Sequence, residues 1–318
     1  MQKQKQQQIA RETKSNNEES KEEKNIISSI VRNKNKLKIG FIGQGFVGKN
    51  QADDYERRGY SPVRYSLEPQ FIKNKKEIGK CDIVFIAVPT PTTPEGFDDS
   101  IVRQAVSLVA KGKIAVIKST VLSGTTESIQ QEYKDRIVLH APEFLSEATA
   151  SRDAAFPDRN IIGIPKDTPL FVECAKLVLS SLPTAPYNKI CSSREAELIK
   201  YARNTMGLVR IVFVNILYDL SQSLETDWSN IEEAISNDPQ NGPTYSRPLH
   251  KSGRGAGGHC FIKDFGALKK FFASRIDDKK SMAVLSSLEA KNIELLLSTQ
   301  KDLDLLKGVY GEDVTNQI

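Results

Sequence analysis

A single cysteine lies in residues 257–264, Gly-Gly-His-Cys-Phe-Ile-Lys-Asp, directly after a pair of glycines. Lys263 and Asp264 follow Cys260 within about one helical turn. Glycines allow a backbone to approach a substrate closely, and a nearby cation favours the thiolate form of a cysteine. These residue types could therefore form a covalent nucleophile with its activating charge. The alternative is that Cys260 is a small buried apolar residue, as most free cysteines are.

A second motif, Gly-Gln-Gly-Phe-Val-Gly at 43–48, follows the apolar run 37–42, which predicts a buried strand. A helical stretch through Arg58 comes next. A strand, a GxGxxG turn and a helix in this order predict a Rossmann unit, in which a pyrophosphate lies at the helix N-terminus. Gly43 would make the tight turn, Gly45 would admit the pyrophosphate and Gly48 would pack the helix on the sheet. The expected cofactor-binding residues of this loop are Gly43, Gln44, Gly45, Phe46, Val47 and Gly48.

The type of dinucleotide depends on the predicted second strand, 62–66. Where Rossmann folds that prefer NAD usually have Asp or Glu for the ribose hydroxyls, this sequence has Ser66. Glu68 could take over that role. Arg64 could instead bind a 2′-phosphate, although an alternating strand would point it outward. We therefore predict NAD as the cofactor and leave NADP open.

Further strands are expected at 81–88, 114–117, 137–139, 160–164 and 187–191, with helices at 98–111 and 169–182. Strands that alternate with helices through short connections favour parallel pairing in a doubly wound α/β sheet. Ligands bind outside the carboxyl ends of such strands, so Thr120, Glu143 and Glu147 are site candidates. The proline-rich segment 89–94 should form a stiff loop over the same crevice.

The character of the sequence changes at Ser193. From there to about Leu224 it predicts one long helix that is apolar nearly all round, which indicates burial or self-association. Lys200 and Asn204 lie on one face of this helix, although Glu197 and Lys200 could be a surface pair instead. Further helices are expected at 228–236, 264–275 and 279–306, and the long loop 237–258 is typical of a functional segment.

These elements predict four parts: a disordered polar tail (1–36), a Rossmann domain (37–192), an all-helical central and dimerisation domain (193–310) and a short tail (311–318). The first 36 residues contain nine Lys/Arg and five Asp/Glu, so most of the net charge of +5 lies there. The remainder presents no basic face for nucleic acid, and no apolar run could span a membrane. Four scattered cysteines and three histidines predict no metal site and a reducing compartment, the cytoplasm.

Taken together, the motifs resemble those of the UDP-glucose/GDP-mannose dehydrogenase family, from about Leu37 to Gln300. The matching blocks are 43–48, Val-Pro-Thr-Pro (88–91), Lys-Ser-Thr-Val (118–121), Pro-Glu-Phe-Leu (142–145) with Pro-Asp-Arg (157–159), and Lys200 and Asn204 with 257–264. The resemblance implies oxidation of a nucleotide-sugar CH₂OH to a carboxylate in two hydride transfers that reduce two NAD, as in polysaccharide biosynthesis.

The resemblance also implies roles for individual residues. Cys260 would attack the aldehyde-level intermediate and form a thiohemiacetal, which the second hydride transfer converts to a thioester. Lys200 and Asn204 would stabilise the oxyanion. Asp264 would orient or activate the lysine and the water.

The remaining roles implied by the resemblance concern hydrolysis and the cofactor. Glu143 or Glu147 would be the general base in hydrolysis, and Thr120 would position a water or the cofactor. Outside the glycine loop, the cofactor-binding residues would be Ser66, Val88, Pro89, Thr90, Thr120, Glu147 and Lys263.

The sequence departs from the family in several places. Members usually continue into a second Rossmann-like domain that binds the nucleotide of the substrate. We therefore expect a short form of the enzyme without that domain, or a separate chain that supplies it. Residues 240–242 stand where the family has Arg-Ile-Gly, and Ala148 stands where it has a glycine. Ser66 stands where NAD-binding members have the Asp or Glu that binds the ribose hydroxyls. We expect a homodimer through the helix 193–224.

Two other functions stay open. A β-hydroxyacid dehydrogenase shares a Rossmann domain, a helical domain and the KxxxN pair, but it performs one oxidation and does not need Cys260. A cofactor-binding scaffold would bind NAD without turnover.

Overall fold

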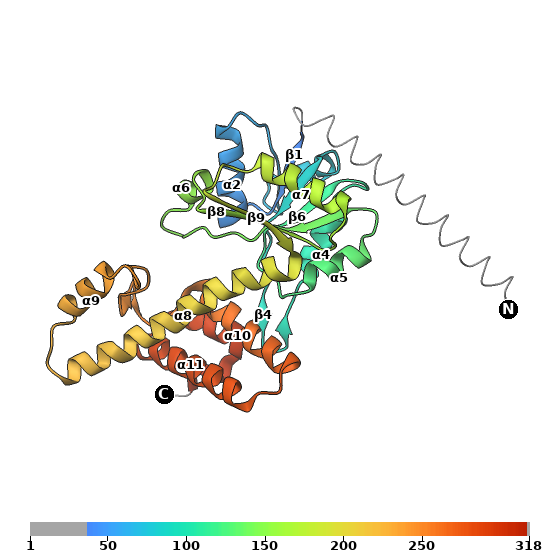
Figure 1. Ribbon diagram of the computed structural model, residues 1–318. Coiled ribbons are helices and arrows are strands. Elements are labelled where there is room, and N and C mark those ends of the chain that lie inside the picture. The colour runs from blue at the N-terminus through green and yellow to red at the C-terminus, as the bar shows by residue number, and fades with distance from the viewer. Residues whose placement is uncertain (1–36, 317–318) are drawn as a thin grey trace, which may run out of the picture. The chain divides into compact units, whose positions relative to one another are not determined.

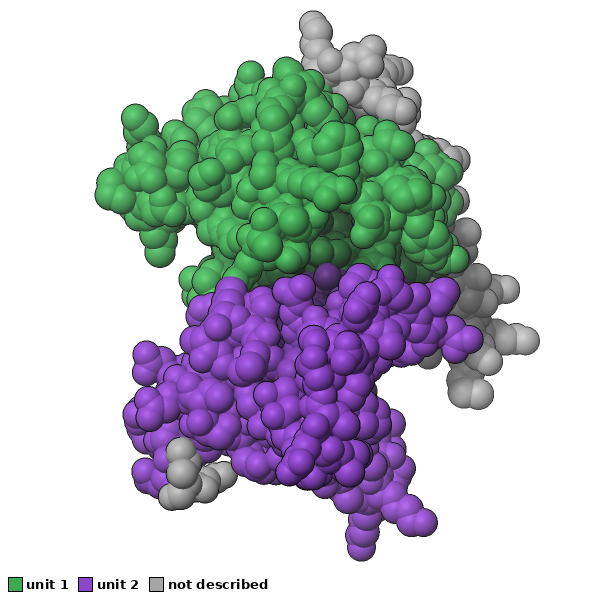
Figure 2. Space-filling view, turned by 90° about the vertical axis from the view of Figure 1, so that its left-hand side faces the viewer, with its two compact units in different colours: residues 1–89, 100–197 green, residues 90–99, 198–318 purple. Residues whose placement is uncertain are grey.

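The computed structural model describes residues 37–316, so the predicted tail 1–36 lies outside the described residues. The chain forms two compact units, shown in different colours in Figure 2. Of the described residues, unit 1 holds 37–89 and 100–197, and unit 2 holds 90–99 and 198–316. Unit 2 thus includes a short segment that lies within the sequence of unit 1.

Unit 1 is built on a seven-stranded sheet with the order β2-β1-β3-β6-β7-β8-β9. The strands are β1 (Ile39–Ile42), β2 (Val63–Tyr65), β3 (Ile83–Ile86), β6 (Ile114–Ile117), β7 (Ile137–His140), β8 (Arg159–Ile164) and β9 (Tyr187–Ser192). The first five strands are parallel. The order reverses beside β1, so the loop after β1 lies at the switch point where doubly wound folds bind ligands. The predicted fold class is confirmed.

Helices connect these strands. They are α2 (Phe46–Arg57), α3 (Lys75–Ile78) after the 3-10 turn η2 (Ile72–Asn74), α4 (Ser100–Ser107), α5 (Thr125–Glu132), α6 (Ala150–Ala155) and α7 (Pro169–Ser181). The sequence analysis did not predict α5 and α6, because both are short and polar. No helix within residues 37–316 combines the length and the apolar character needed to cross a membrane.

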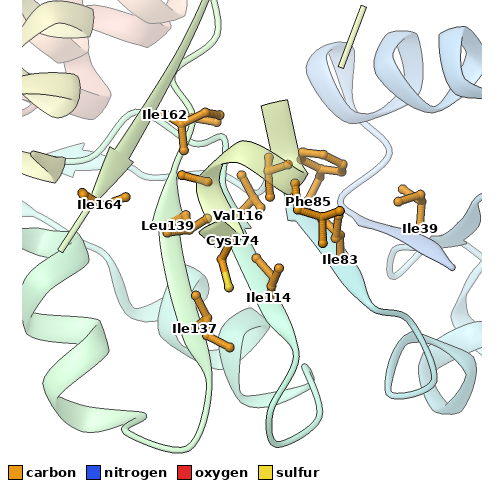
Figure 3. Packing of buried hydrophobic residues seen from close by; sticks show 14 of the residues in the cluster. Ile39, Ile83, Phe85, Ile114, Val116, Ile137, Leu139, Ile162, Ile164 and Cys174 are labelled. Atoms are coloured by element: carbon orange, nitrogen blue, oxygen red, sulfur yellow. The ribbon is translucent and has the colours of Figure 1, made fainter. Parts of the chain in front are cut away.

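The central strands are buried on both faces. Phe85 of β3 packs with Tyr55 of α2 in the main core cluster, where Figure 3 shows Cys174 of α7 among the strand side chains. The neighbouring residues Val84 and Ile86 are also fully buried, and they point to the opposite layer because successive strand residues alternate. In that layer α4 contacts β3 and α5 contacts β7.

The prediction of parallel pairing is wrong for one pair of neighbouring strands, β7 and β8. β8 pairs antiparallel with β7 through His140 and Gly163, and β9 is parallel to β8. The cause is the connection 141–158: its helix α6 packs against α2 instead of crossing the sheet, so the chain enters β8 from the carboxyl edge (Figure 1). Because of this register, the first half of β8 lies beyond the ends of the parallel strands.

Unit 2 is mainly helical. Its helices are α8 (Ser193–Ser223, whose first turn belongs to unit 1), α9 (Trp228–Asn237), α10 (Gly258–Arg275), α11 (Lys279–Ser298) and α12 (Leu303–Tyr310), followed by the 3-10 turn η3 (Glu312–Asn316). Two short hairpins also belong to unit 2: β4 (Thr92–Thr93) with β5 (Gly96–Phe97), and β10 (Leu249–His250) with β11 (Gly253–Arg254), of which the second interrupts the part expected to be all-helical.

The helices α8 and α10 approach each other closely. A Cβ on Gly207 of α8 would lie 2.8 Å from the Phe261 ring of α10, so a larger residue would separate the helices. Next to this contact, Leu208 and Val212 of α8 form a buried cluster with Phe265. Glycine at 207 therefore brings the polar residues of the two helices within reach of each other.

Two expected boundaries in unit 2 are wrong. The helix α10 begins at Gly258, not at Asp264, so Cys260 lies in its first turn. The single helix expected at 279–306 is two helices, because Gln300 and Asp302 adopt positive φ angles of 53° and 55° between them. The segment 89–94 leads into the β4–β5 hairpin, whose backbone oxygens at Thr93 and Pro94 accept hydrogen bonds from Lys270 Nζ at 3.0 and 2.8 Å.

Candidate active site

The glycine-rich loop of unit 1 uses its glycines in two ways. A Cβ on Gly43, where φ is +91°, would lie 2.1 Å from the Ala87 oxygen, and one on Gly48 would lie 1.9 Å from the Gly43 oxygen. Both glycines are therefore required by packing. Gly45 differs, because nothing lies within 4 Å of its Cβ position. As the N-cap of α2, Gly45 leaves open space directly in front of the helix.

This open space fits the pyrophosphate of a dinucleotide. Gly45 provides no side-chain cap, so the first backbone N–H groups of α2 can donate to phosphate oxygens. Arg64 pairs with Asp53 at 2.7 Å and with Glu56 at 2.8 Å, and these two carboxylates would repel a 2′-phosphate. At the end of β2, Ser66 Oγ accepts a hydrogen bond from the Glu68 N–H at 3.3 Å. The charges around Arg64 thus favour NAD over NADP.

The ends of β3 and β6 are joined by a residue that the sequence analysis did not place in the site, Ser119. Its hydroxyl accepts from the Val88 N–H at 2.9 Å and donates to the Val88 oxygen at 2.7 Å. These bonds fix the backbone of Val88, which precedes Pro89, and Thr120 follows Ser119, half-buried. Its position directly after a buried strand, the same signal that identified Thr120, would have been sufficient to find Ser119.

The end of β7 presents a buried carboxylate. Glu143 is 7% exposed, and its Oε1 accepts from the Leu145 N–H at 3.0 Å. Its Oε2 is buried and has no hydrogen-bond partner among residues 37–316. A buried carboxylate oxygen is costly unless it is paired, so this atom is suited to a water or a ligand. Glu147 is exposed, and the Arg159 guanidinium lies 4.2 Å from the centroid of the neighbouring Phe144 ring.

In unit 2, the polar faces of α8 and α10 are joined by a buried hydrogen bond. Asn204 Nδ2 donates to Asp264 Oδ2 at 2.6 Å, and the two side chains are 2% and 1% exposed. Lys263 Nζ binds the other oxygen of Asp264 at 2.5 Å. Hydrogen bonds to a buried charged group are worth about 1.5–3 kcal/mol each. Lys200 lies one turn before Asn204 on the same face and is 5% exposed.

Cys260 differs from the other cysteines. It is exposed and lies one turn before Asp264, on the same face of α10. Burial raises the pKa of the Cys81 thiol to about 11 and that of Cys174 to about 12, and burial also raises the pKa of Cys191. These three thiols are held neutral at ordinary pH. The first turn of a helix, in contrast, stabilises a thiolate through its free N–H groups and dipole.

The alternative of a surface pair between Glu197 and Lys200 is wrong, because both residues are buried. The Glu197 carboxylate accepts from the N–H groups of Gly124 at 2.6 Å and Thr126 at 2.8 Å, and thereby caps α5. Burial raises the pKa of Glu197 to about 7, although the hydrogen bonds from Thr126 and Gly124 oppose the rise. The sequence contains no signal for this role, since the partners are backbone groups.

The predicted site residues divide between the two units. Unit 1 holds the loop 43–48, Ser66, Val88, Pro89, Thr120, Glu143 and Glu147, and unit 2 holds Thr90, Lys200, Asn204, Cys260, Lys263 and Asp264. Unit 1 thus carries the groups expected to bind a cofactor, at one edge of its sheet. Unit 2 carries a thiol together with buried polar groups. The part of the chain that the structure describes contains no group of three or more His, Cys, Asp or Glu residues that could hold a metal ion.

Comparison with known proteins agrees with this division. Residues 66–177 match the NAD-binding domain of the UDP-glucose/GDP-mannose dehydrogenase family, and residues 194–292 match the central domain of the same family. The match to that NAD-binding domain indicates NAD as the cofactor. The UDP-glucose 6-dehydrogenase of Rickettsia prowazekii is 29% identical over 277 residues, which are 79% of this chain and 60% of that protein.

Solved structures show the same fold. A UDP-glucose dehydrogenase from the hyperthermophilic archaeon Pyrobaculum islandicum superimposes with a TM-score of 0.70 at 26% identity, over 85% of this chain and 70% of that chain. A 3-hydroxyisobutyrate dehydrogenase from Mycobacterium tuberculosis has a TM-score of 0.63 at 14% identity, over 86% of this chain and 98% of that chain, and shows the fold alone.

The chain spans about half to three fifths of the length of the curated relatives it matches first. The two family matches nevertheless cover both of its units and about two thirds of its residues. The first match lies mainly in unit 1 and begins after the glycine loop, and the second lies mainly in unit 2 and includes Cys260. The chain therefore belongs to the UDP-glucose/GDP-mannose dehydrogenase family.

Proposed function

We propose that the chain oxidises the CH₂OH group of a nucleotide sugar of the UDP-glucose type to a carboxylate, with Cys260 as the nucleophile. The observation that carries this proposal is the buried hydrogen bond between Asn204 and Asp264. It fixes two helix faces, one with Lys200 and one with Cys260, that together hold an ammonium, an amide and a thiol. These are the groups that a thioester mechanism requires.

The cofactor site is the loop 43–48, with Ser66, Val88, Pro89, Thr90, Thr120, Glu147 and Lys263 as further proposed contacts. NAD⁺ held by these residues would supply the hydride acceptor for each of the two oxidations. The space at Gly45 and the free N–H groups of α2 support the pyrophosphate contact. In the structure Lys263 is paired with Asp264.

The covalent steps belong to unit 2. Loss of a hydride and a proton converts the alcohol to an aldehyde, and the Cys260 thiolate then forms a C–S bond to the aldehyde carbon. The carbonyl electron pair moves to the oxygen, which becomes an oxyanion. Lys200 stabilises this charge with its ammonium, and Asn204 with the amide hydrogen that Asp264 does not occupy. Loss of the second hydride leaves a thioester.

Hydrolysis requires a base, for which we propose Glu143, with Glu147 as the exposed alternative and Thr120 as the residue that positions the water. Glu143 takes a proton from the water whose oxygen attacks the thioester carbon. The C–S bond then breaks, and the Cys260 thiolate is regenerated with release of the carboxylate product. The buried, unpaired Oε2 of Glu143 supports this role.

The proposal is tested by incubating the protein with NAD and a panel of UDP- and GDP-sugars while NADH and sugar consumption are followed. Two NADH per sugar, with the sugar acid identified by mass spectrometry, is the expected result. One NADH per sugar would place the protein with the β-hydroxyacid dehydrogenases. NAD binding without turnover on any sugar would favour the scaffold function, or a separate chain that completes the substrate site.

We further propose that the chain forms a homodimer through α8, in the cytoplasm, where its cysteines stay reduced. From Met206 onward, apolar side chains recur every three or four residues along the exposed face of this helix, and Leu198 lies eight residues earlier. They are Leu198, Met206, Val209, Phe213, Ile216 and Leu220, each at least 38% exposed, with Leu224 directly after the helix. A continuous exposed stripe of this kind on one helix indicates a protein interface.

Replacing Phe213, which is 57% exposed, by aspartate should convert the dimer to a monomer, because a charge would be buried in the apolar stripe. Light scattering after size-exclusion chromatography measures the change. Val284→Asp on α11, at a side chain 60% exposed, is the matched control and should leave the dimer intact. A wild-type protein that elutes as a monomer at all concentrations would contradict the proposal.

A further inference from the structure

The segment before Cys260 has glycine at every second position, at 253, 255 and 257, with a further glycine at 258. The sequence alone indicates a flexible loop that approaches a substrate. In the structure, three of these glycines face side chains of the same chain instead. These side chains come from the end of α11 and from the residues that link α11 to α12. We call Asn292, Thr299, Lys301 and Asp302 the linker cluster.

The linker cluster binds the backbone of the segment 253–258 at six polar atoms. Lys301 Nζ donates to the oxygens of Gly253 at 3.3 Å and Gly255 at 3.0 Å. Thr299 Oγ1 accepts from the Arg254 N–H at 3.1 Å. The Asn292 amide accepts from the Ala256 N–H at 2.7 Å and donates to the Ala256 oxygen at 3.1 Å. Asp302 Oδ2 accepts from the Gly258 N–H at 2.7 Å.

Glycine is required where the linker cluster touches the segment. A Cβ on Gly253 would lie 2.2 Å from Thr299 Oγ1, and one on Gly257 would lie 2.0 Å from Asp302 Oδ2. Contacts under 3 Å cannot be accommodated without movement of the neighbouring residue, so alanine at 253 or 257 would displace the linker cluster. Gly258 differs, because its Cβ position is open and its φ is +80°.

Two residues of the linker cluster are buried, and a third, Asp302, has an unusual backbone conformation. Asn292 is 4% and Lys301 is 5% exposed, so each must bind partners within the protein. Both lie far from the segment in sequence, by up to 48 residues for Lys301. Asp302 has a left-handed backbone, with φ of 55°, a conformation that costs free energy for a residue other than glycine and is concentrated at functional sites.

We propose that the four residues of the linker cluster are positioning residues that hold 253–258 so that α10 begins at Gly258 and presents Cys260 in its first turn. The inference rests on the proposed role of Cys260 as the nucleophile. Only the first turn of a helix offers free N–H groups to a thiolate. Asp302 accepts from the N–H of Gly258 itself, and thereby fixes where that turn begins.

The test compares Asp302→Ala with Asp302→Asn. Both variants lack the negative charge, but asparagine retains an oxygen that can accept from the Gly258 N–H. We expect kcat of Asp302→Ala to lie about tenfold to a hundredfold below that of Asp302→Asn, as for small misplacements of reacting groups. The KM for NAD should agree between the two variants within about twofold, because the cofactor contacts are unchanged.

A second readout does not need turnover. The rate of alkylation of Cys260 by iodoacetamide is measured against pH in a Cys191→Ser background, with the modified peptide identified by mass spectrometry. Asp302→Ala should shift the midpoint of this profile to higher pH than Asp302→Asn. If the wild type oxidises no sugar but this difference appears, the proposed function fails while the positioning of the thiol stands.

Equal kcat values and coincident alkylation profiles for the two variants would overturn the inference. Circular dichroism establishes that both variants are folded. If Asp302→Ala does not fold, Thr299→Ser and Thr299→Val provide the same comparison at the Arg254 N–H. Serine keeps the accepting hydroxyl there, whereas valine has a similar shape without it.

Discussion

Replacing Cys260 by alanine is expected to lower the rate of sugar-acid formation by at least about a thousandfold, as removal of a nucleophile does in other covalent enzymes. Alanine cannot form the C–S bond, so the aldehyde-level intermediate has no route to a thioester. NAD affinity should be unchanged, because Cys260 is not among the proposed cofactor contacts. NADH formation and an NAD binding titration on the same preparation measure the two effects.

Cys191→Ala is the matched control for this experiment. Cys191 lies on β9, is half-buried, and has a pKa raised by burial, so its loss should leave turnover within about twofold of the wild type. A Cys260→Ala protein that still yields two NADH per sugar would show that the carboxylate forms without a thioester. The roles proposed for Lys200 and Asn204 would then have to be assigned to a different intermediate.

Replacing Gly45 by valine is expected to abolish NAD binding while leaving thermal unfolding almost unchanged. The Cβ position at Gly45 is empty to 4 Å and its φ of −73° suits any residue, so the fold can accommodate the side chain. The branched side chain would instead fill the space in front of α2 where the pyrophosphate binds. We expect the dissociation constant for NAD to rise by about a hundredfold or more, since each loss of about 1.4 kcal/mol of binding free energy raises that constant tenfold.

Gly48→Ala is the opposite case and serves as the comparison. Its Cβ would lie 1.9 Å from the Gly43 oxygen, so the helix must move away from the loop. Such overpacking costs about 1–3 kcal/mol or more, and the unfolding temperature should fall. Calorimetry with and without NAD separates the two variants. Equal stability losses in both would contradict the assignment of Gly45 to the ligand and Gly48 to packing.

The first half of the fold could be predicted because its signals are local. Buried strands appear as short apolar runs, and the glycine spacing after β1 identifies both the turn and the helix that follows. The direction of β8 could not be predicted in this way. It depends on the path of residues 141–158, whose helix α6 packs against α2, and this packing is a contact between distant segments.

The candidate site shows the same limit. The spacing of Lys200 and Asn204 correctly predicts that the two residues share a helix face. The start of α10 was placed six residues too late, because glycines at 257 and 258 favour a loop when local propensity alone is considered. The groups that fix this start, Asn292 and Asp302, lie 36 and 44 residues from their partners. Neither shows any local signal of that role.

The inclusion of residues 90–99 in unit 2 has a consequence for synthesis in the cell. Thr93 leaves the ribosome 177 residues before Lys270, the side chain that binds its backbone oxygen. The β4–β5 hairpin therefore emerges long before α10 and α12, the helices it packs against, exist. Because nascent chains grow by about 5–20 residues per second, the hairpin remains without these partners for roughly ten seconds or more. Unit 2 can be completed only when nearly the whole chain has been translated.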